Sequence, residues 1–253
     1  MGTSKRAIRG LLALGLAVGL VAAACTSSSA PNVPGGGNGL PGAGGTGSLS
    51  SGLSGNLATL DSYQFSWSFS TSSSGATAAE TGSFKTTGTV VNKPTKAYKI
   101  NDLGMFQIIV IGDKGWMSSD NGSTWLADDT YKVGSSSLDG LLPDSMYASD
   151  FDSNAGGFTV AGSETKNGID CFHYTGASSL GALGAIAGAN ATVKQDLWVS
   201  KAGNFPVSGF YGYSASSGGQ TGSFGYSFDV TNVNDAANNK VEAPTNVVAL
   251  PSF

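Results

Sequence analysis

The clearest pattern along the chain is an alternation of apolar and polar residues that begins at Tyr63. Every second residue from there to Phe69 is aromatic, and the residues between them are Gln or Ser. A repeat of two residues is typical of a β-strand with one apolar face. The same alternation recurs at residues 224–230, and weaker versions occur at 169–174, 193–199 and 205–213. Trp198 points away from the apolar side of its segment. We therefore expect a fold built mainly from such strands.

Residues 105–111 are a different kind of strand candidate, because they are apolar apart from Gln107. Apolar residues on both sides of the alternation indicate a strand that is covered on both faces. Turn signals rich in Gly, Asn, Asp and Pro separate the candidate strands at short intervals, at residues 92–94, 112–115, 120–122, 167–168 and 202–204. Strands joined by tight turns predict an antiparallel meander.

Three segments depart from the strand pattern. Residues 57–60 indicate the end of a short helix or a turn just before the first strand. Residues 138–152 carry apolar side chains at helical spacing, and Pro143 restricts where that helix begins. Residues 178–191 are rich in Ala, Leu and Gly and predict a second short apolar helix. Because two short helices cannot cover about ten strands, either a second sheet packs on the first or one sheet curls around the helices and leaves a cavity.

The N-terminal segment has the order of a secretory signal. Lys5, Arg6 and Arg9 precede an uncharged stretch of apolar residues and glycine from 11 to 23, and small residues at 22–24 lead directly into Cys25. The apolar run is shorter than the roughly 20 residues that span a bilayer. We therefore interpret residues 1–24 as a signal peptide. An ordinary signal followed by a chance cysteine is the alternative.

A cysteine directly after the small residues resembles the lipobox of bacterial lipoproteins. The resemblance implies cleavage before Cys25 and a diacylglycerol thioether on its sulfur, and therefore an extracytoplasmic protein anchored by lipid to the bacterial cell membrane. Residues 26–54 then contain no charge and are dominated by Gly, Ser and Pro. Such a segment cannot bury enough apolar surface to order itself, so residues 25–54 are expected to form a lipidated, flexible tether of about 30 Å mean reach.

Charge and cysteine content narrow the function further. Cleavage before Cys25 removes both arginines of the chain and one lysine, which leaves 229 residues with ten lysines against 17 acids, a formal charge of −7. A nucleic-acid-binding surface needs clustered basic residues, so nucleic acid is excluded as a partner. With Cys25 acylated, Cys171 has no cysteine to pair with. Its strand-like surroundings favour a buried free thiol over an intermolecular or reactive one.

Candidate catalytic and metal-binding chemistry is sparse. His173 is the one histidine, it stands between two aromatic residues, and no Gly-x-Ser-x-Gly motif is present. A structural histidine is therefore expected, and the chain is not expected to be an enzyme. Residues 150–154 have the first oxygen ligands of a calcium loop, but Ala161 stands where the bidentate glutamate belongs. We expect no metal and no cofactor.

Several segments together resemble the LolA-like superfamily of bacterial lipoproteins, in particular the mycobacterial LppX/LprG group. The resemblance covers about residues 57–244 and lies in the strand and turn order, not in a catalytic motif. The segments that carry it are 60–63 (LDSY), 109–117 (IVIGDKGWM), 122–125 (GSTW), 167–169 (NGI), 173–174 (HY), 196–199 (DLWV), 203–207 (GNFPV), 228–234 (FDVTNVN) and 241–244 (VEAP).

This resemblance implies a mainly β (α+β) domain over residues 55–253, a curved antiparallel half-barrel with short helices on its concave side and an apolar cavity between them. It also implies that the protein binds or carries lipid or lipidated molecules in that cavity. The residues expected to contact the ligand are Phe65, Trp67, Phe69, Leu141, Leu142, Met146, Leu180 and Leu183. A non-catalytic cell-surface structural or interaction module with a filled core is the alternative. In either case we expect a monomer.

Overall fold

The computed structural model describes residues 49, 53–74, 80–128, 130–134, 139–147, 157–176, 191–217 and 219–248. The chain divides into two units, residues 1–40 and residues 41–253. Every described residue belongs to the second unit, and the fold reported below is the fold of that unit. Cys25, most of the tether predicted over residues 25–54, and residues 178–190 of the helix predicted over 178–191 lie outside the described residues. Ala191 belongs to a strand and not to a helix.

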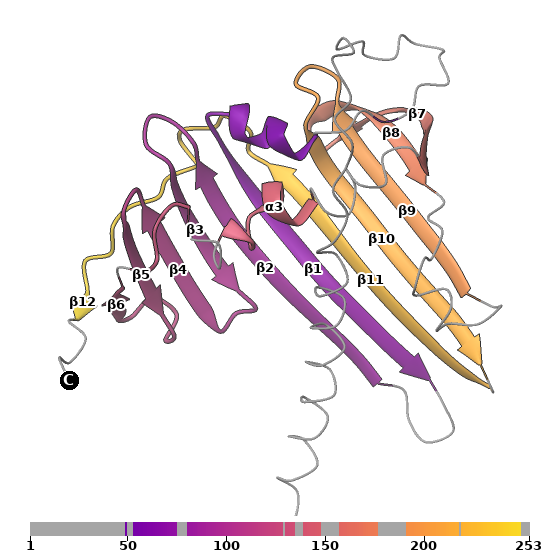
Figure 1. Cartoon of the computed structure of the whole chain (residues 1–253), viewed down its shortest axis with the longest axis horizontal. Helices are drawn as coiled ribbons and strands as arrows, with labels where there is room; N and C mark the ends of the chain where they lie inside the picture. Colours follow the sequence, from indigo (N-terminus) through magenta and orange to yellow (C-terminus); the bar gives the residue numbers. More distant parts are fainter. Residues whose placement is uncertain are drawn as a thin grey trace, which may run out of the picture. The chain divides into compact units, whose positions relative to one another are not determined.

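The described strands form one open, curved sheet in the order β12-β6-β5-β4-β3-β2-β1-β11-β10-β9-β8-β7 (Figure 1). Neighbours pair antiparallel except β12, which runs parallel to β6. The chain is therefore mainly β with a single sheet, as the half-barrel prediction requires. The strands are β1 (Ser62–Ser74), β2 (Glu80–Val91), β3 (Ala97–Asp102), β4 (Phe106–Ile111), β5 (Lys114–Ser118), β6 (Trp125–Ala127), β7 (Phe158–Lys166), β8 (Ile169–Gly176), β9 (Ala191–Ser200), β10 (Pro206–Ser217), β11 (Gln220–Thr231) and β12 (Val247–Val248).

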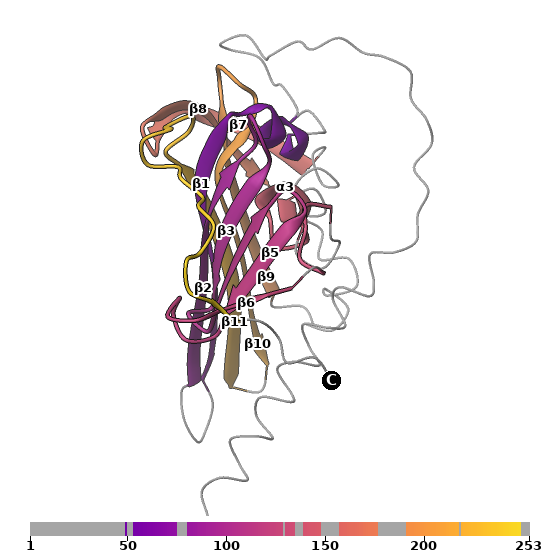
Figure 2. The ribbon, with the colours of Figure 1, turned by 90° about the vertical axis from the view of Figure 1, so that its left-hand side faces the viewer.

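Two short helices cover one face of the sheet, called here the inner face. The 3-10 helix η1 (Ser54–Thr59) precedes β1, and α3 (Pro143–Tyr147) follows β6. Figure 2 shows both on the same side of the sheet, the side toward which it curves. Helix α3 begins at Pro143, within the segment 138–152 for which a helix is predicted, because proline lacks the amide hydrogen that a later helical position must donate.

The core lies between these helices and the inner face. Leu53 and Leu57 from the η1 segment and Leu142 beside α3 are fully buried together with Tyr63 and Phe228 of the sheet. Leu49 is also buried, with an exposed fraction of 5%. The core therefore includes Leu49, which precedes the first strand by more than ten residues.

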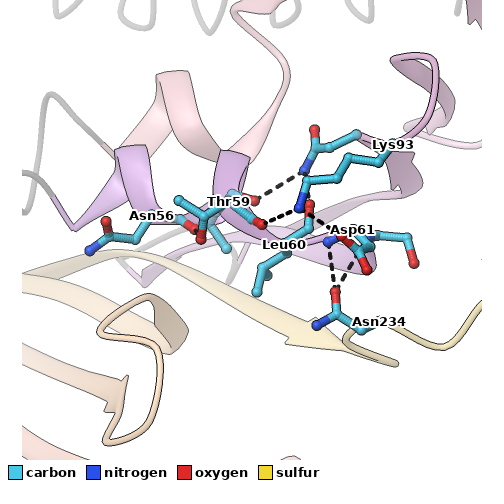
Figure 3. A network of polar contacts seen from close by, with 9 residues as sticks. Asn56, Thr59, Leu60, Asp61, Lys93 and Asn234 are labelled. Atoms are coloured by element: carbon cyan, nitrogen blue, oxygen red, sulfur yellow. Dashed lines mark hydrogen bonds and ion pairs between the residues drawn. The ribbon is translucent and has the colours of Figure 1, made fainter.

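Polar contacts fix the point where η1 passes into β1 (Figure 3). The Lys93 ammonium lies 2.7 Å from the Asp61 carboxylate and donates to the carbonyl of Thr59. The amide of Asp61 donates to the side-chain oxygen of Asn234, which comes from the segment after β11. Three segments distant in sequence therefore meet at the start of the central strand.

Along the central strands β1, β2 and β11, the opposite, outer face of the sheet carries mainly small hydroxyl side chains. Ser68 and Ser227 of the paired strands β1 and β11 lie 2.9 Å apart between hydroxyl oxygens, and Ser72 and Ser223 lie 2.6 Å apart. The segment 232–246 then crosses this face from β11 to β12 (Figure 2). The outer face is therefore polar over these central strands.

Strand β4 confirms the expectation of a strand covered on both sides. Ile108 on the inner face and Ile109 on the outer face are both buried. The predicted start of this strand is wrong by one residue, because Met105 belongs to the turn after β3 and is 55% exposed. Leu103 and Gly104 of that turn both have positive φ, which an extended strand does not permit.

Candidate functional site

The aromatic row of β1 lies wholly on the inner face, as its alternation predicts. Tyr63, Phe65 and Trp67 are buried and Phe69 is half-buried, whereas Ser66 and Ser68 face outward. The antiparallel register places Phe65 opposite Val230, Trp67 opposite Phe228 and Phe69 opposite Tyr226. Phe65, Trp67 and Phe69 therefore each meet another apolar residue on β11.

The expected ligand contacts divide into two groups by burial. Phe65, Trp67 and Leu142 are buried in the core, with exposed fractions of 3%, 7% and 1%. Phe69 and Leu141 are half-buried and pack against that core. Phe65, Trp67 and Leu142 belong to the same buried core. The side chain of Met146, and residues Leu180 and Leu183, lie outside what the structure describes.

Beyond the two helices, the inner face carries a second group of aromatic rings, called here the distal aromatic cluster. The register of β1, β2, β10 and β11 places all six members on this face. Phe69 lies 5.8 Å from Phe224 and 5.9 Å from Tyr226 between ring centroids, and Tyr211 stacks on Tyr226 at 5.4 Å. The members are Phe69, Phe84, Tyr211, Tyr213, Phe224 and Tyr226.

The distal aromatic cluster is less buried than the core it adjoins. Phe84 is 43% exposed, and the other five rings are half-buried. Fully burying an aromatic side chain stabilises a protein by about 2–3 kcal/mol, so partly exposed rings in this number form a surface with unused capacity to bury apolar groups. The alternation at 224–230 indicated Phe224 and Tyr226 in the sequence. Phe84 was missed because it is the one apolar residue in a run of glycine, hydroxyl and lysine residues from 81 to 89.

A polar atom lies at the boundary between the core and the distal aromatic cluster. The indole nitrogen Nε1 of Trp67 is buried and has no hydrogen-bond partner. The Trp67 ring meets Phe69 edge to face at 4.9 Å. Buried Trp N–H groups usually find an acceptor, and leaving one unsatisfied costs about 1–3 kcal/mol. Trp67 therefore offers an unused donor next to the apolar cluster.

Acidic and phenolic groups surround α3 where it meets the sheet. Burial raises the pKa of the Asp144 carboxyl, and the nearby Lys96 ammonium partly opposes this. Burial, with the charge of Asp144 second, also raises the pKa of Tyr63. Tyr98 donates its hydroxyl to Asp139 over 3.3 Å. The hydrogen bond from Tyr98 joins β3 to the segment just before α3.

His173 lies on the outer face of β8, where it contacts residues of both neighbouring strands. Its Nε2 is 3.0 Å from the carboxylate of Asp196 on β9, and its Nδ1 is 3.4 Å from that of Glu164 on β7. The imidazole stacks on Trp198 at 4.4 Å, and the indole N–H of Trp198 donates to the same Glu164 oxygen. These contacts describe a side chain that joins three strands, which is the structural role expected from the sequence.

Cys171 is fully buried and free, as the sequence favoured. Its thiol donates to the carbonyl of Ile169 over 3.3 Å. Burial raises the pKa of this thiol to about 11. A cysteine with so little thiolate at neutral pH is a poor nucleophile and a poor metal ligand.

Among the described residues, no group of three or more His, Cys, Asp or Glu side chains is placed to hold a metal ion. The calcium-like segment at 150–154 lies outside those residues. In the part of the chain that the structure covers, no helix is long and apolar enough to cross a bilayer.

The open curved sheet with two short helices on its concave face is the architecture that the LolA-like resemblance implied. Solved structures similar to this chain include LprF from Mycobacterium bovis, with 10% identity and a TM-score of 0.39 over 76% of this chain and 93% of that one. The lipoprotein LppX from Mycobacterium tuberculosis is 16% identical, with a TM-score of 0.36 over 74% of this chain and 98% of that one. A LolA superfamily protein from Nitrosomonas europaea is 13% identical, with a TM-score of 0.23 over 70% and 91%.

No protein-family model matches the sequence, and no curated protein matches it either. The solved structures that are similar to this chain include members of the group named from the sequence.

Proposed function

We propose that this chain is a membrane-anchored, extracytoplasmic lipoprotein that binds the acyl chains of lipids or lipidated molecules on the inner face of its sheet. The observation that carries the proposal is the distal aromatic cluster, a half-buried apolar surface that continues the core beyond η1 and α3. Each methylene group that such a surface removes from water contributes about 0.8 kcal/mol. An acyl chain therefore needs no sequence motif to bind there.

The unpartnered Trp67 N–H supports an amphipathic ligand over a pure hydrocarbon. A carbonyl oxygen of an ester or a carboxylic acid would accept from this donor, while its acyl chain lies along the distal aromatic cluster. The lipobox around Cys25 and the uncharged segment after it support a location where such ligands are at hand. Catalysis has no part in the proposal.

The division of the expected contacts by burial changes where on the inner face the ligand binds. Phe65, Trp67 and Leu142 fill the space between the sheet and the helices. We therefore assign acyl contact to Phe69, Phe84 and Tyr213 of the distal aromatic cluster. The filled interface at η1 and α3 is also the observation that favours the second candidate, a structural or interaction module without a lipid ligand.

Replacing an exposed ring at the cluster tests the proposal. The full chain is purified in a mild detergent and titrated with the fluorescent fatty acid cis-parinaric acid. Phe84→Ser should weaken binding about tenfold, because a ring that is 43% exposed in the free protein is buried by the ligand. Lys85→Ser, the next residue on β2 but on the outer face, is the matched control and should leave the affinity unchanged.

Mass spectrometry of lipids that remain with the washed native protein gives a second measurement. The wild type should retain acyl lipids that the Phe84→Ser chain loses. No retained lipid together with no probe binding would reject the carrier and favour the filled structural module. If Phe84→Ser and Lys85→Ser reduced lipid retention and probe binding equally, the assignment of the lipid site to the inner face would be contradicted.

A further inference from the structure

A groove of about 420 Å³ lies on the outer face of the sheet, opposite the side of the aromatic rings. The register shows how it is built from cross-strand rows. One row runs across four strands from Ser66 (β1) through Thr87 (β2) and Asn101 (β3) to Gln107 (β4). In the next row, Thr89 pairs with Lys99. The volume falls within the range of small-molecule sites in proteins.

The polar side chains of the groove differ from the other hydroxyls on the same face. Further along β1 and β11, Ser68 pairs with Ser227 and Ser72 with Ser223 through their hydroxyls. In the groove, by contrast, no side-chain hydrogen bond within the protein is made by the following described residues: Ser66, Thr87, Thr89, Lys99, Asn101 and Gln107. The amide oxygen of Asn101 is moreover buried without any partner. The groove therefore holds a dense set of unused donors and acceptors.

Burial shows that these groups line a hollow instead of a flat surface. Ser66, Thr87 and Asn101 are half-buried, whereas Ser70 and Ser83 on the same face are exposed. Gln64 marks the upper end of the groove, where its side-chain amide donates to the carbonyl of Asn238 in the segment that crosses this face. A half-buried polar group gains more from a hydrogen-bonded ligand than an exposed one, because it is already partly withdrawn from water.

The chemistry of the lining selects the class of ligand. An apolar ligand would remove these polar groups from water without giving them partners, which is unfavourable. A phosphate accepts hydrogen bonds and needs several cations, and Lys99 is the one charged side chain among the lining residues described. A hydroxyl group both donates and accepts hydrogen bonds. Ligand hydroxyls therefore match a lining of side-chain hydroxyls and amides, which also offer both donors and acceptors.

We infer that this groove binds a neutral carbohydrate, through hydrogen bonds from Asn101, Gln107 and the hydroxyls of Ser66 and Thr87 to sugar hydroxyls. The site is on the opposite face from the acyl surface and is independent of it. The same sugar chemistry could come from a free oligosaccharide or from a glycolipid headgroup. The experiment distinguishes these two sources.

The full chain is kept in an amine-oxide detergent, which has no sugar, and titrated with maltotriose and with mannotriose by calorimetry. We expect a Kd of about 1 mM for at least one trisaccharide, typical of a shallow polar site. Asn101→Ala should weaken binding at least tenfold. The matched control Ser70→Ala changes an exposed serine of the same face outside the groove and should have no effect.

Three further results decide the ligand class and its source. Lys99→Met should leave the affinity for the neutral sugar within about twofold. A complete loss of sugar binding in this variant, together with binding of inorganic phosphate by the wild type, would identify an anion site and overturn the inference. Binding to phosphatidylglycerol vesicles only when they contain a diglucosyl lipid would assign the sugar to a headgroup. Phe84→Ser should retain sugar binding even if acyl binding fails. No binding of either trisaccharide or of the diglucosyl vesicles, or equal binding by Asn101→Ala, would reject the site.

Discussion

The ring of Phe228 on β11 lies directly over Gly209, its partner on β10, in the space where any other residue would carry its side chain. The same relationship joins Phe65 of β1 to Gly88 of β2. In both pairs the glycine has no special turn conformation. Its role is to leave room for an aromatic ring that covers the neighbouring backbone and is itself buried.

Gly209→Ala should therefore destabilise the fold by about 1–3 kcal/mol, because the added methyl group falls far inside van der Waals contact with the Phe228 ring. Urea unfolding followed by tryptophan fluorescence measures this change. Gly222→Ala on β11 is the control, since no atom lies within 4 Å of its added carbon. Equal midpoints for the two variants would show that the ring adjusts without cost.

The Trp67 indole proton should report the ligand. In a spectrum of ¹⁵N-labelled full chain, its resonance should move downfield when a fatty acid is added, and should stay in place with an alkane of the same length. Trp125 is the internal control, because its Nε1 already donates to the carbonyl of Gly122 over 3.0 Å. Equal shifts with the acid and the alkane would contradict a hydrogen bond from Trp67.

Cys171 should react slowly in the folded protein. Burial raises its pKa to about 11, so about one thiol in a thousand is ionised at pH 8, against roughly a quarter in an unfolded chain. Labelling by a maleimide should be at least a hundredfold faster in denaturant, and the native rate should rise as the pH approaches 11. A Cys171→Ser chain gives the background. Rapid labelling of the native protein at pH 8 would show that the thiol is accessible.

Removing His173 should loosen three strands at one side of the sheet. His173→Phe keeps an aromatic ring beside Trp198 but loses the contacts to Asp196 and Glu164, and should cost about 1–2 kcal/mol. Hydrogen exchange should show faster amide exchange in β7 and β8 with β1 unchanged. Ser163→Ala, an exposed change on β7, serves for comparison. Unaltered amide exchange in β7 would mean that ring stacking on Trp198 is enough to stabilise these strands without the contacts to Asp196 and Glu164.

The turn between β5 and β6 should lose stability in acid. The Ser118 hydroxyl and then the Thr124 amide hydrogen-bond to the Asp120 carboxylate and lower its pKa below the ordinary 3.8. A lowered folded-state pKa gives stability that is present above pH 3.8 and is lost as the pH falls through the folded value. Asp120→Asn should reduce the pH dependence of unfolding in this window. Asp113→Asn, in the exposed turn before β5, should retain it.

Much of the sheet follows from local pattern. The alternation from Tyr63 to Phe69 predicted both the strand and its buried side, because one face of this sheet packs on a core and the other meets water. Trp198 likewise faces outward as predicted, and the structure shows that it stacks there on His173. A helix was predicted within residues 138–152, and α3 begins there at Pro143, whose ring restricts the backbone before it.

The separation of the inner face into a buried core and a half-buried distal aromatic cluster could not be predicted in the same way. Phe65 and Phe69 belong to one unbroken pattern, yet the first is in the core and the second reaches the distal aromatic cluster. Their difference depends on how far η1 and α3 extend over the sheet, which is a tertiary relationship. The outer groove was missed for a related reason. Its row from Ser66 to Gln107 joins four strands, and each contributes one ordinary polar residue.

The open sheet has two ends, and both limit association with other chains. Strand β12 at one end is two residues long. At the other end, a bulge between Val160 and Gly162 interrupts β7, and Glu164 and Lys166 follow it. Short, bulged or charged edges are poor templates for another strand. Many copies of this protein could therefore lie side by side at high density on one surface without their edge strands pairing into fibres. Each copy would keep both faces of its sheet available to small ligands.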